Sequence, residues 1–177
     1  AGAITVGCEQ LQNGALDDSI VVSGYHGSLG SGDEVELAID SHRRAGIRAH
    51  HTATHLLNHA LRAVAGPDSD QRGSLVSPDR LRFDYAASAA LDETALAEVE
   101  RRVNESIAAG QAVHAVPSPL EQARAVNTLR AVFGERYPDP VRVVSIGPEV
   151  DELLASPDDP RWMDHSVEFC GGTHLDR

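Results

Sequence analysis

Apolar and polar positions alternate over several short stretches, and this alternation predicts β-strands. β-branched runs at 4–6, 20–22 and 35–39 are separated by Gly, Asn, Asp and Ser, which favours a small antiparallel sheet. A second alternation follows a Ser-Pro-Asp turn and predicts a hairpin over 73–85. The run at 141–146 is almost continuously apolar, as expected of a buried strand. Two more strands are expected at 113–116 and 166–170.

Elsewhere the apolar residues recur every three or four positions, which predicts helices. Asp40 or Ser41 can cap a helix that runs to about Val64, and Gly66-Pro67 would end it. A second helix would begin at Asp92 and end at Gly110. Its apolar stripe is expected to be core, and consists of Leu96, Val99, Val103 and Ile107.

Two later segments carry local signals for a helix and for a loop. Ser118-Pro-Leu-Glu121 has the form of a capping box with proline at the first helical position, and predicts a third helix. Residues 148–164 are rich in Pro, Asp and Glu and should form a surface loop, apart from a turn of helix at 150–154. The elements together favour an α+β fold, with a mainly antiparallel sheet packed with helices. A boundary near Asp40 would divide a small β part, 1–40, from a helix-bearing body, 41–177.

Composition narrows the class of protein. A chain of 177 residues can bury a sizeable core, and no apolar run is long enough to span a membrane. The two cysteines, Cys8 and Cys170, make a disulfide framework improbable and favour a cytoplasmic protein. A net charge of -12 argues against indiscriminate adhesion to nucleic acid, yet a local contact stays open at two arginine groups. These groups are Arg43, Arg44 and Arg48, and Arg80 with Arg82.

Two pairs of metal-ligating residues lie near opposite ends of the chain. His51 and His55 are four positions apart on the first predicted helix, so both side chains project from one face. Cys170 and His174 flank two glycines, which predicts a strand running into a tight loop where thiolate and imidazole converge. Three imidazoles and one thiolate form a tetrahedral donor set suited to Zn²⁺. The sequence therefore predicts a zinc site built from both ends.

Several kinds of zinc protein are disfavoured. A metalloprotease of the HExxH type needs glutamate after the first histidine, and position 52 is threonine. A nucleobase deaminase needs H-x-E and P-C-x-x-C motifs, and neither is present. A zinc finger is disfavoured because the chain between the two pairs is apolar enough to fold by itself.

Three segments resemble one family, the editing domain of alanyl-tRNA synthetase. They are His51-Thr-Ala-Thr-His-Leu-Leu-Asn-His-Ala-Leu-Arg62, Gln71 to Asp84, and Ser166-Val-Glu-Phe-Cys-Gly-Gly-Thr-His-Leu175. The stretch Tyr137 to Gly147 fits as well, so the resemblance covers about Val21 to the end. Threonyl-tRNA synthetase has a related domain with the same HxxxH and CxxxH pairs, and related free-standing editing proteins exist. The segment from Gln71 to Asp84 is similar to the alanyl type.

The resemblance implies hydrolysis of the ester that joins serine or glycine to the alanine tRNA. Such correction is needed because one methyl group changes binding by only ~1–3 kcal/mol, and a small pocket rejects an added hydroxyl poorly. The resemblance assigns His51, His55, Cys170 and His174 to Zn²⁺, with either three or four of them bound at once. It assigns Gln71 to a catalytic or recognition role, since its amide can both donate and accept. Substrate contacts are expected from Thr54, Gly171, Gly172 and Thr173.

The chain also departs from the family. The editing domain normally starts with a further β segment carrying a Gly-Gly-Gln motif and continues past CxxxH, so residues 1–40 are expected to be an incomplete β-barrel part of a longer synthetase. The expected partners are the acceptor end of tRNA(Ala) and the remainder of the parent synthetase, which would bind ATP and serve protein biosynthesis. No membrane partner is expected. Two alternatives stay open: a zinc-stabilised tRNA-binding module without hydrolytic activity, and a free-standing trans-editing deacylase.

Overall fold

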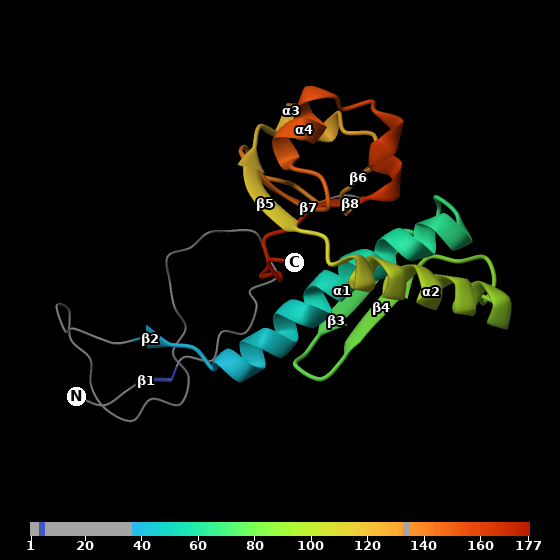
Figure 1. The fold of residues 1–177 in the computed structure, drawn as a ribbon, viewed down its shortest axis with the longest axis horizontal. Helices are drawn as coiled ribbons and strands as arrows, with labels where there is room; N and C mark the ends of the chain where they lie inside the picture. The colour runs from blue at the N-terminus through green and yellow to red at the C-terminus, as the bar shows by residue number, and fades with distance from the viewer. Residues whose placement is uncertain (1–3, 6–36, 133–134) are drawn as a thin grey trace.

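The computed structural model describes residues 4–5, 37–132 and 135–177 (Figure 1). Its longest element is helix α1, Ser41–Ala65. Asp40 caps this helix, since its Oδ1 accepts a hydrogen bond of 2.9 Å from the Arg43 amide. Gly66 ends it with a φ of 99°, a conformation that glycine adopts without strain. The predicted start and end of this helix are thus confirmed.

One side of α1 packs against a hairpin and a second helix. The hairpin consists of β3, Gln71–Val76, and β4, Leu81–Tyr85, which pair antiparallel as predicted. Helix α2, Glu93–Ala109, begins at its Asp92 cap and ends at Gly110. A small core forms where these elements meet, and contains Ala60, Leu61, Val99, Val103, Phe83 and Tyr85.

The predicted apolar stripe of α2 is only half correct. Val99 is buried and Val103 is partly buried against it, but Leu96 is 54% exposed and Ile107 is 56% exposed. The prediction is wrong for the two outer positions, because only Val99 and Val103 pack into the small core shared with α1.

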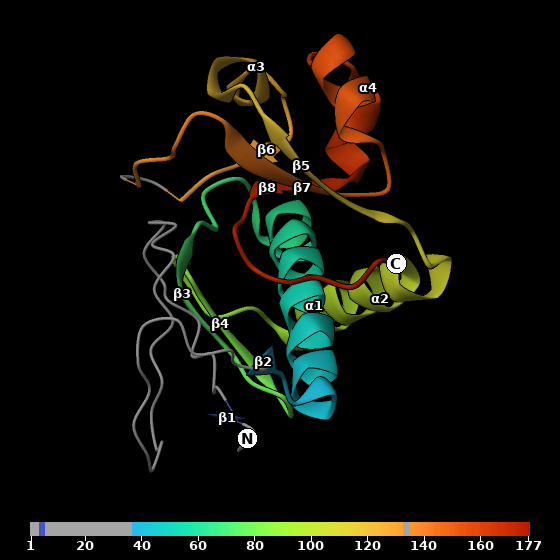
Figure 2. The ribbon, with the colours of Figure 1, turned by 90° about the vertical axis from the view of Figure 1, so that its left-hand side faces the viewer.

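The other half of the molecule is a four-stranded sheet with the order β5-β7-β8-β6. Its strands are β5, Val113–Ser118, β6, Leu129–Arg130, β7, Val141–Ile146, and β8, Ser166–Phe169. All neighbours are antiparallel except β6 and β8. Figure 2 shows this sheet lying across one end of α1.

Short helices cover the outer face of this sheet. They are α3, Leu120–Arg124, α4, Val150–Ala155, and the 3-10 helix η1, Pro160–Asp164. The main core lies between them and the sheet, and includes Val143, Leu153, Trp162, Val167 and Phe169. Because side chains alternate along a strand, Val167 and Phe169 point to this core while Ser166 and Glu168 face α1. Ser166 Oγ lies 3.4 Å from the His55 carbonyl oxygen, and Asn58 of α1 donates to Glu168.

Two predictions about the helical segments need correction. The capping box at Ser118 does not form, because Ser118 ends strand β5 and its hydroxyl donates to the Val116 carbonyl. The Leu120 amide bonds instead to Asp139 Oδ1, and Pro119 precedes the helix rather than starting it. The segment predicted to be mostly loop also contains η1, which Asp159 caps and Trp162 anchors in the core.

The predicted α+β fold with a mainly antiparallel sheet is confirmed. Within the predicted β part, β1, Ile4–Thr5, and β2, Leu37–Ala38, pair parallel, so the antiparallel arrangement expected there is wrong for these two strands. The strand expected at 20–22 and the rest of the barrel part lie outside the described residues. The boundary between 1–40 and 41–177 stays a prediction. Within the described residues, no helix is both long and apolar enough to cross a lipid bilayer.

Candidate metal centre

Helix α1 presents both histidines of the first pair to the sheet. His51 and His55 are buried on the helix face that meets β8, one turn apart. Their ring centroids are 5.3 Å apart. The predicted convergence of the pair on one side of the helix is therefore present.

The second pair comes from the loop that follows β8. This loop leaves the sheet at Cys170 and passes across α1 (Figure 2). Arg142 of β7 holds it, because its Nη1 donates to the carbonyls of Cys170 and Gly172 at 2.8 and 2.7 Å. At the far end Arg48 of α1 donates to the His174 carbonyl. Two arginines thus hold the loop, Arg142 before His174 and Arg48 at His174 itself.

The four side chains meet at one point. The donor atoms of His51, His55, Cys170 and His174 all lie within 4.8 Å of one another. The Nε2 atoms of His51 and His174 are each 3.4 Å from Cys170 Sγ. In a tetrahedral zinc site the usual Zn–N and Zn–S lengths place such atoms about 3.5 Å apart. The group could therefore hold a metal ion, and its donor set and spacing fit Zn²⁺.

Burial keeps the imidazoles neutral, as metal ligands must be. Burial, helped by the charges of the neighbouring His51 and Arg130, lowers the pKa of His55 to about 3. Burial likewise lowers the pKa of His51 and of His174. Burial raises the pKa of the Cys170 thiol, so without a cation beside it this group keeps its proton at neutral pH.

Sequence analysis missed the residue that supports His55 from behind. Glu168 Oε2 lies 3.6 Å from His55 Nδ1, a buried atom with no hydrogen-bond partner among the described residues. The other carboxylate oxygen accepts a 2.9 Å hydrogen bond from Asn58 Nδ2. Burial raises the pKa of Glu168 to about 7, against the opposing charge of Arg130. One signal in the sequence could have identified Glu168. It lies two positions before Cys170, and residues two apart on a strand project from the same face.

The predicted substrate residues lie on two sides of the cluster. Gly171 and Thr173 are exposed on the loop, and a Cβ added at Gly171 would meet nothing within 4 Å, so its face is open to a ligand. The Gly172 amide points at Cys170 Sγ at 3.5 Å. Thr54 is buried, and its hydroxyl donates to the His50 carbonyl within α1. Thr52 lies nearer, with Oγ1 3.3 Å from His174 Nδ1.

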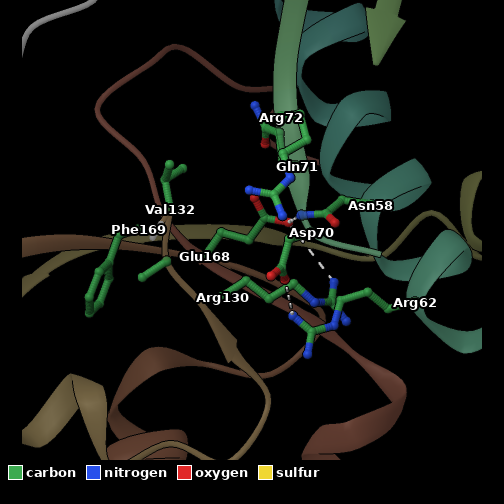
Figure 3. A pocket seen from close by; sticks show the side chains of 10 residues that line it. Asn58, Arg62, Asp70, Gln71, Arg72, Arg130, Val132, Glu168 and Phe169 are labelled. Carbon is green, nitrogen blue, oxygen red and sulfur yellow. Dashed lines mark hydrogen bonds and ion pairs between the residues drawn. The ribbon is translucent and has the colours of Figure 1, made fainter. Parts of the chain in front are cut away.

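Gln71 lies in a cavity of about 230 Å³ at the start of β3 (Figure 3). The cavity is also lined by Asn58 and Glu168, so it borders the carboxylate that contacts His55. Gln71 Nε2 donates to Ser74 Oγ at 3.2 Å. The structure thus brings Gln71 to the neighbourhood of the cluster, on the Glu168 side.

Fold and site together define the class: an α+β protein whose candidate metal centre joins one long helix to the loop after the last strand. No family model matches the chain. Several proteins are nevertheless close to half identical to most of it. Alanine–tRNA ligase from Candida albicans is 50% identical over 149 residues, and the cytoplasmic enzyme from Bombyx mori is 49% identical over 151. A bacterial alanine–tRNA ligase, from Desulfitobacterium hafniense, is 46% identical over 149 residues.

These matches cover 84–85% of the chain but only 15–16% of each ligase. The chain is therefore homologous to one segment of alanyl-tRNA synthetases, and it spans about one sixth of the length of the curated relatives that it matches.

Proposed function

We propose that this chain is the editing part of an alanyl-tRNA synthetase, which hydrolyses the ester of serine or glycine wrongly joined to tRNA(Ala). The observation that carries the proposal is the convergence of the His51/His55 pair with the Cys170/His174 pair, in a chain about half identical over most of its length to alanine–tRNA ligases. In this proposal the chain works in the cytoplasm with two partners, the rest of the synthetase and the acceptor end of tRNA(Ala). The rest of the synthetase would carry out the ATP-dependent reaction.

In this proposal His51, His55, Cys170 and His174 hold Zn²⁺. The bound ion would supply Lewis-acid charge beside the ester and would tie α1 to the loop after β8. The chain's own groups would position the substrate. Gln71 can donate to and accept from the serine hydroxyl or the attacking water. An alanine ester lacks that hydroxyl and cannot form this hydrogen bond with the Gln71 amide. The site would therefore bind the serine ester more tightly than the alanine ester.

The loop and the helix would supply the remaining contacts. Gly171 offers an open backbone surface to the ester, and Gly172 and Thr173 extend it toward His174. Thr54 already donates its proton to the His50 carbonyl, so its oxygen can only accept from the substrate. Glu168 is placed to hold the His55 ring, because its Oε2 lies 3.6 Å from His55 Nδ1.

The test is deacylation of serine-charged and alanine-charged tRNA(Ala) by the zinc-loaded chain. We expect faster release of serine, lost in Cys170→Ala and reduced at least tenfold in Gln71→Ala. Glu121→Ala, at an exposed position on α3, is the matched control and should retain full activity. A longer form that restores the flanking regions runs in parallel. Absence of serine release from both forms would contradict the editing function.

One observation favours a second candidate, a zinc-stabilised tRNA-binding module. All four donor atoms converge, and a site closed by four protein ligands is typical of structural zinc. This candidate predicts that tRNA binding depends on zinc while ester hydrolysis is absent from the longer form as well.

A further inference from the structure

The loop that carries Cys170 and His174 is held by the rest of the fold at several points along its length. Residues 170–177 follow β8 without regular secondary structure, and two adjacent glycines allow many backbone conformations there. The path of the loop is set by hydrogen bonds to α1, β5 and β7. Near its end, for example, the Val113 amide of β5 donates to the Asp176 carbonyl at 2.9 Å. All of these contacts are made by groups of the chain itself.

Arg142 of β7 fixes the backbone on both sides of Cys170. Its carbonyl oxygen accepts from the Cys170 amide at 3.1 Å, and its Nη1 donates to the Cys170 carbonyl at 2.8 Å. The same Nη1 donates to the Gly172 carbonyl at 2.7 Å, which holds the next turn of the loop. A residue has only two soft backbone dihedrals, so bonds to the peptide groups before and after its Cα restrain the direction of its side chain. Cys170 Sγ is thereby kept facing His51 and His174.

Thr52 of α1 supports His174 in a corresponding way. The His174 ring turns its Nε2 toward Cys170 Sγ, so Nδ1 is the nitrogen on the other side. Thr52 Oγ1 lies 3.3 Å from this Nδ1 and also accepts a 3.1 Å hydrogen bond from the Leu175 amide. A hydroxyl oxygen can accept twice, so it can hold a proton on Nδ1. That tautomer leaves the lone pair of Nε2 free to bind a metal ion.

Both supporting residues lie on elements that also build the centre. Thr52 follows His51 directly on α1, and Arg142 lies on β7, which pairs with the strand that precedes Cys170. Thr52 is buried and Arg142 is half-buried. Donors that their neighbours hold in the binding geometry lose little freedom when a ligand binds, and this raises affinity. Without such support the ion itself would have to order the loop.

We propose that Arg142 and Thr52 are positioning residues of the metal centre, which place Cys170 and His174 for Zn²⁺ before the ion arrives. The inference rests on the metal site of the proposed function and goes beyond it, because it assigns metal affinity to two side chains outside the donor set. It has two consequences. The loop keeps its hydrogen bonds in the metal-free chain, and loss of either supporting group weakens binding although all four ligands remain.

The first test compares zinc affinities, measured by competition with a chromophoric chelator. Arg142→Met and Thr52→Val remove the supporting groups, and each should weaken binding at least tenfold. Thr52→Ser keeps the hydroxyl and should stay within threefold of the original chain. Arg124→Met and Thr94→Val, at exposed positions on α3 and α2, are the matched controls and should have no effect. Unchanged affinity in both Arg142→Met and Thr52→Val would overturn the proposal.

Amide hydrogen exchange in the metal-free chain gives a second test, which stays valid if a variant does not fold. The Cys170 amide donates to the Arg142 carbonyl, and the Leu175 amide donates to Thr52 Oγ1. Relative to their intrinsic rates, both should exchange at least tenfold more slowly than the amide of the exposed Gly171. Equal protection of all three amides, with slow exchange only after zinc is added, would mean that the ion orders the loop and would contradict the inference.

The outcomes separate this inference from the proposed function. A chain that binds no zinc would refute the metal centre and the positioning role together. Zinc binding that Arg142→Met and Thr52→Val leave unchanged would refute the positioning role alone. Weakened binding in these variants without deacylation of serine-charged tRNA(Ala), even in the longer form, would refute editing and leave the positioning role intact.

Discussion

At the scale of single residues, Glu168 lies between the candidate metal centre and the cavity that contains Gln71. One carboxylate oxygen faces His55 Nδ1, and the other is held by Asn58 at the edge of the cavity. A carboxylate behind a ligating imidazole fixes its tautomer and raises its basicity. The contact between helix and strand is therefore expected to tune the metal centre as well as to pack the fold.

Glu168→Gln is expected to weaken zinc binding about tenfold, because an amide is a weaker acceptor for the imidazole N–H than a carboxylate. Competition with a chromophoric chelator measures the affinity. Glu100→Gln, exposed on α2, controls for the loss of one negative charge. Unchanged affinity in Glu168→Gln would mean that the carboxylate serves packing alone.

Zinc binding near pH 7 is expected to release about one proton, from Cys170. Burial raises the pKa of this thiol and lowers the pKa of all three imidazoles, so the thiol is the ligand that carries a proton before binding. Glu168, with a pKa of about 7, is expected to release a fraction of a second proton. Affinity should therefore fall about tenfold for each unit that the pH falls below neutrality.

Calorimetry in two buffers of different ionisation enthalpy measures the released protons. Cys170→Ala removes the thiol contribution and is the comparison. A heat of binding that does not depend on the buffer would show that the thiolate exists before the metal arrives, against the direction of its pKa shift.

At the scale of elements, the position of α1 against the hairpin depends on a close approach at Gly46. A Cβ built on Gly46 would lie 2.4 Å from the carbonyl oxygen of Pro78, in the turn between β3 and β4. Backbone cannot yield as a side-chain end can, so glycine is needed there for packing. The hairpin in turn carries Gln71 to the cavity.

Gly46→Ala is expected to destabilise the protein by about 1–3 kcal/mol through this clash. Helix propensity alone predicts the opposite sign, a gain of about 1 kcal/mol. Urea unfolding decides between the two. Gly171→Ala, where an added Cβ meets nothing within 4 Å, is the control for stability.

Local signals were sufficient to predict most elements. Asp40, Asp92, Gly66 and Gly110 act within one turn of their own position, so the ends of α1 and α2 followed from the sequence. Predictions failed where the structure depends on distant partners. Ser118 belongs to strand β5 and does not cap a helix, and the two-residue strand β6 exists only through its pairing with β8.

The candidate site shows the same division. Its four donors were recognisable because each pair is close in sequence and made of unusual residue types. The contact of Asn58 with Glu168 joins positions 110 residues apart, and neither residue alone signals it. The cavity of Gln71 likewise depends on how β6 and β8 meet α1.

At the scale of the whole molecule, the candidate metal centre lies between its two halves. The small core around α2 and the main core beneath α4 are separate clusters. The four donors connect the long helix of one half to the loop that leaves the sheet of the other. An ion bound there would hold the halves together.

Removal of the ion by a chelator is therefore expected to lower the thermal midpoint of the whole protein. With zinc at about 100 times its Kd, the bound ion should stabilise the folded state by about 2.7 kcal/mol, which corresponds to a rise of about 5–11 °C for a domain of this size. Scanning fluorimetry with and without chelator measures the shift. Cys170→Ala should show a much smaller one, and an equal shift in this variant would place the ion elsewhere.

The distance between the two pairs along the chain also sets an order of events during synthesis. His51 and Cys170 are 119 residues apart. At the usual rate of translation the histidine pair leaves the ribosome on the order of ten seconds before the thiol that completes the set. During that interval α1 offers a two-imidazole chelate to any ion in the cell. Selection of the metal then falls to Cys170 and His174, and exchange of a weakly held first ion for the final one becomes a step in the folding of the protein.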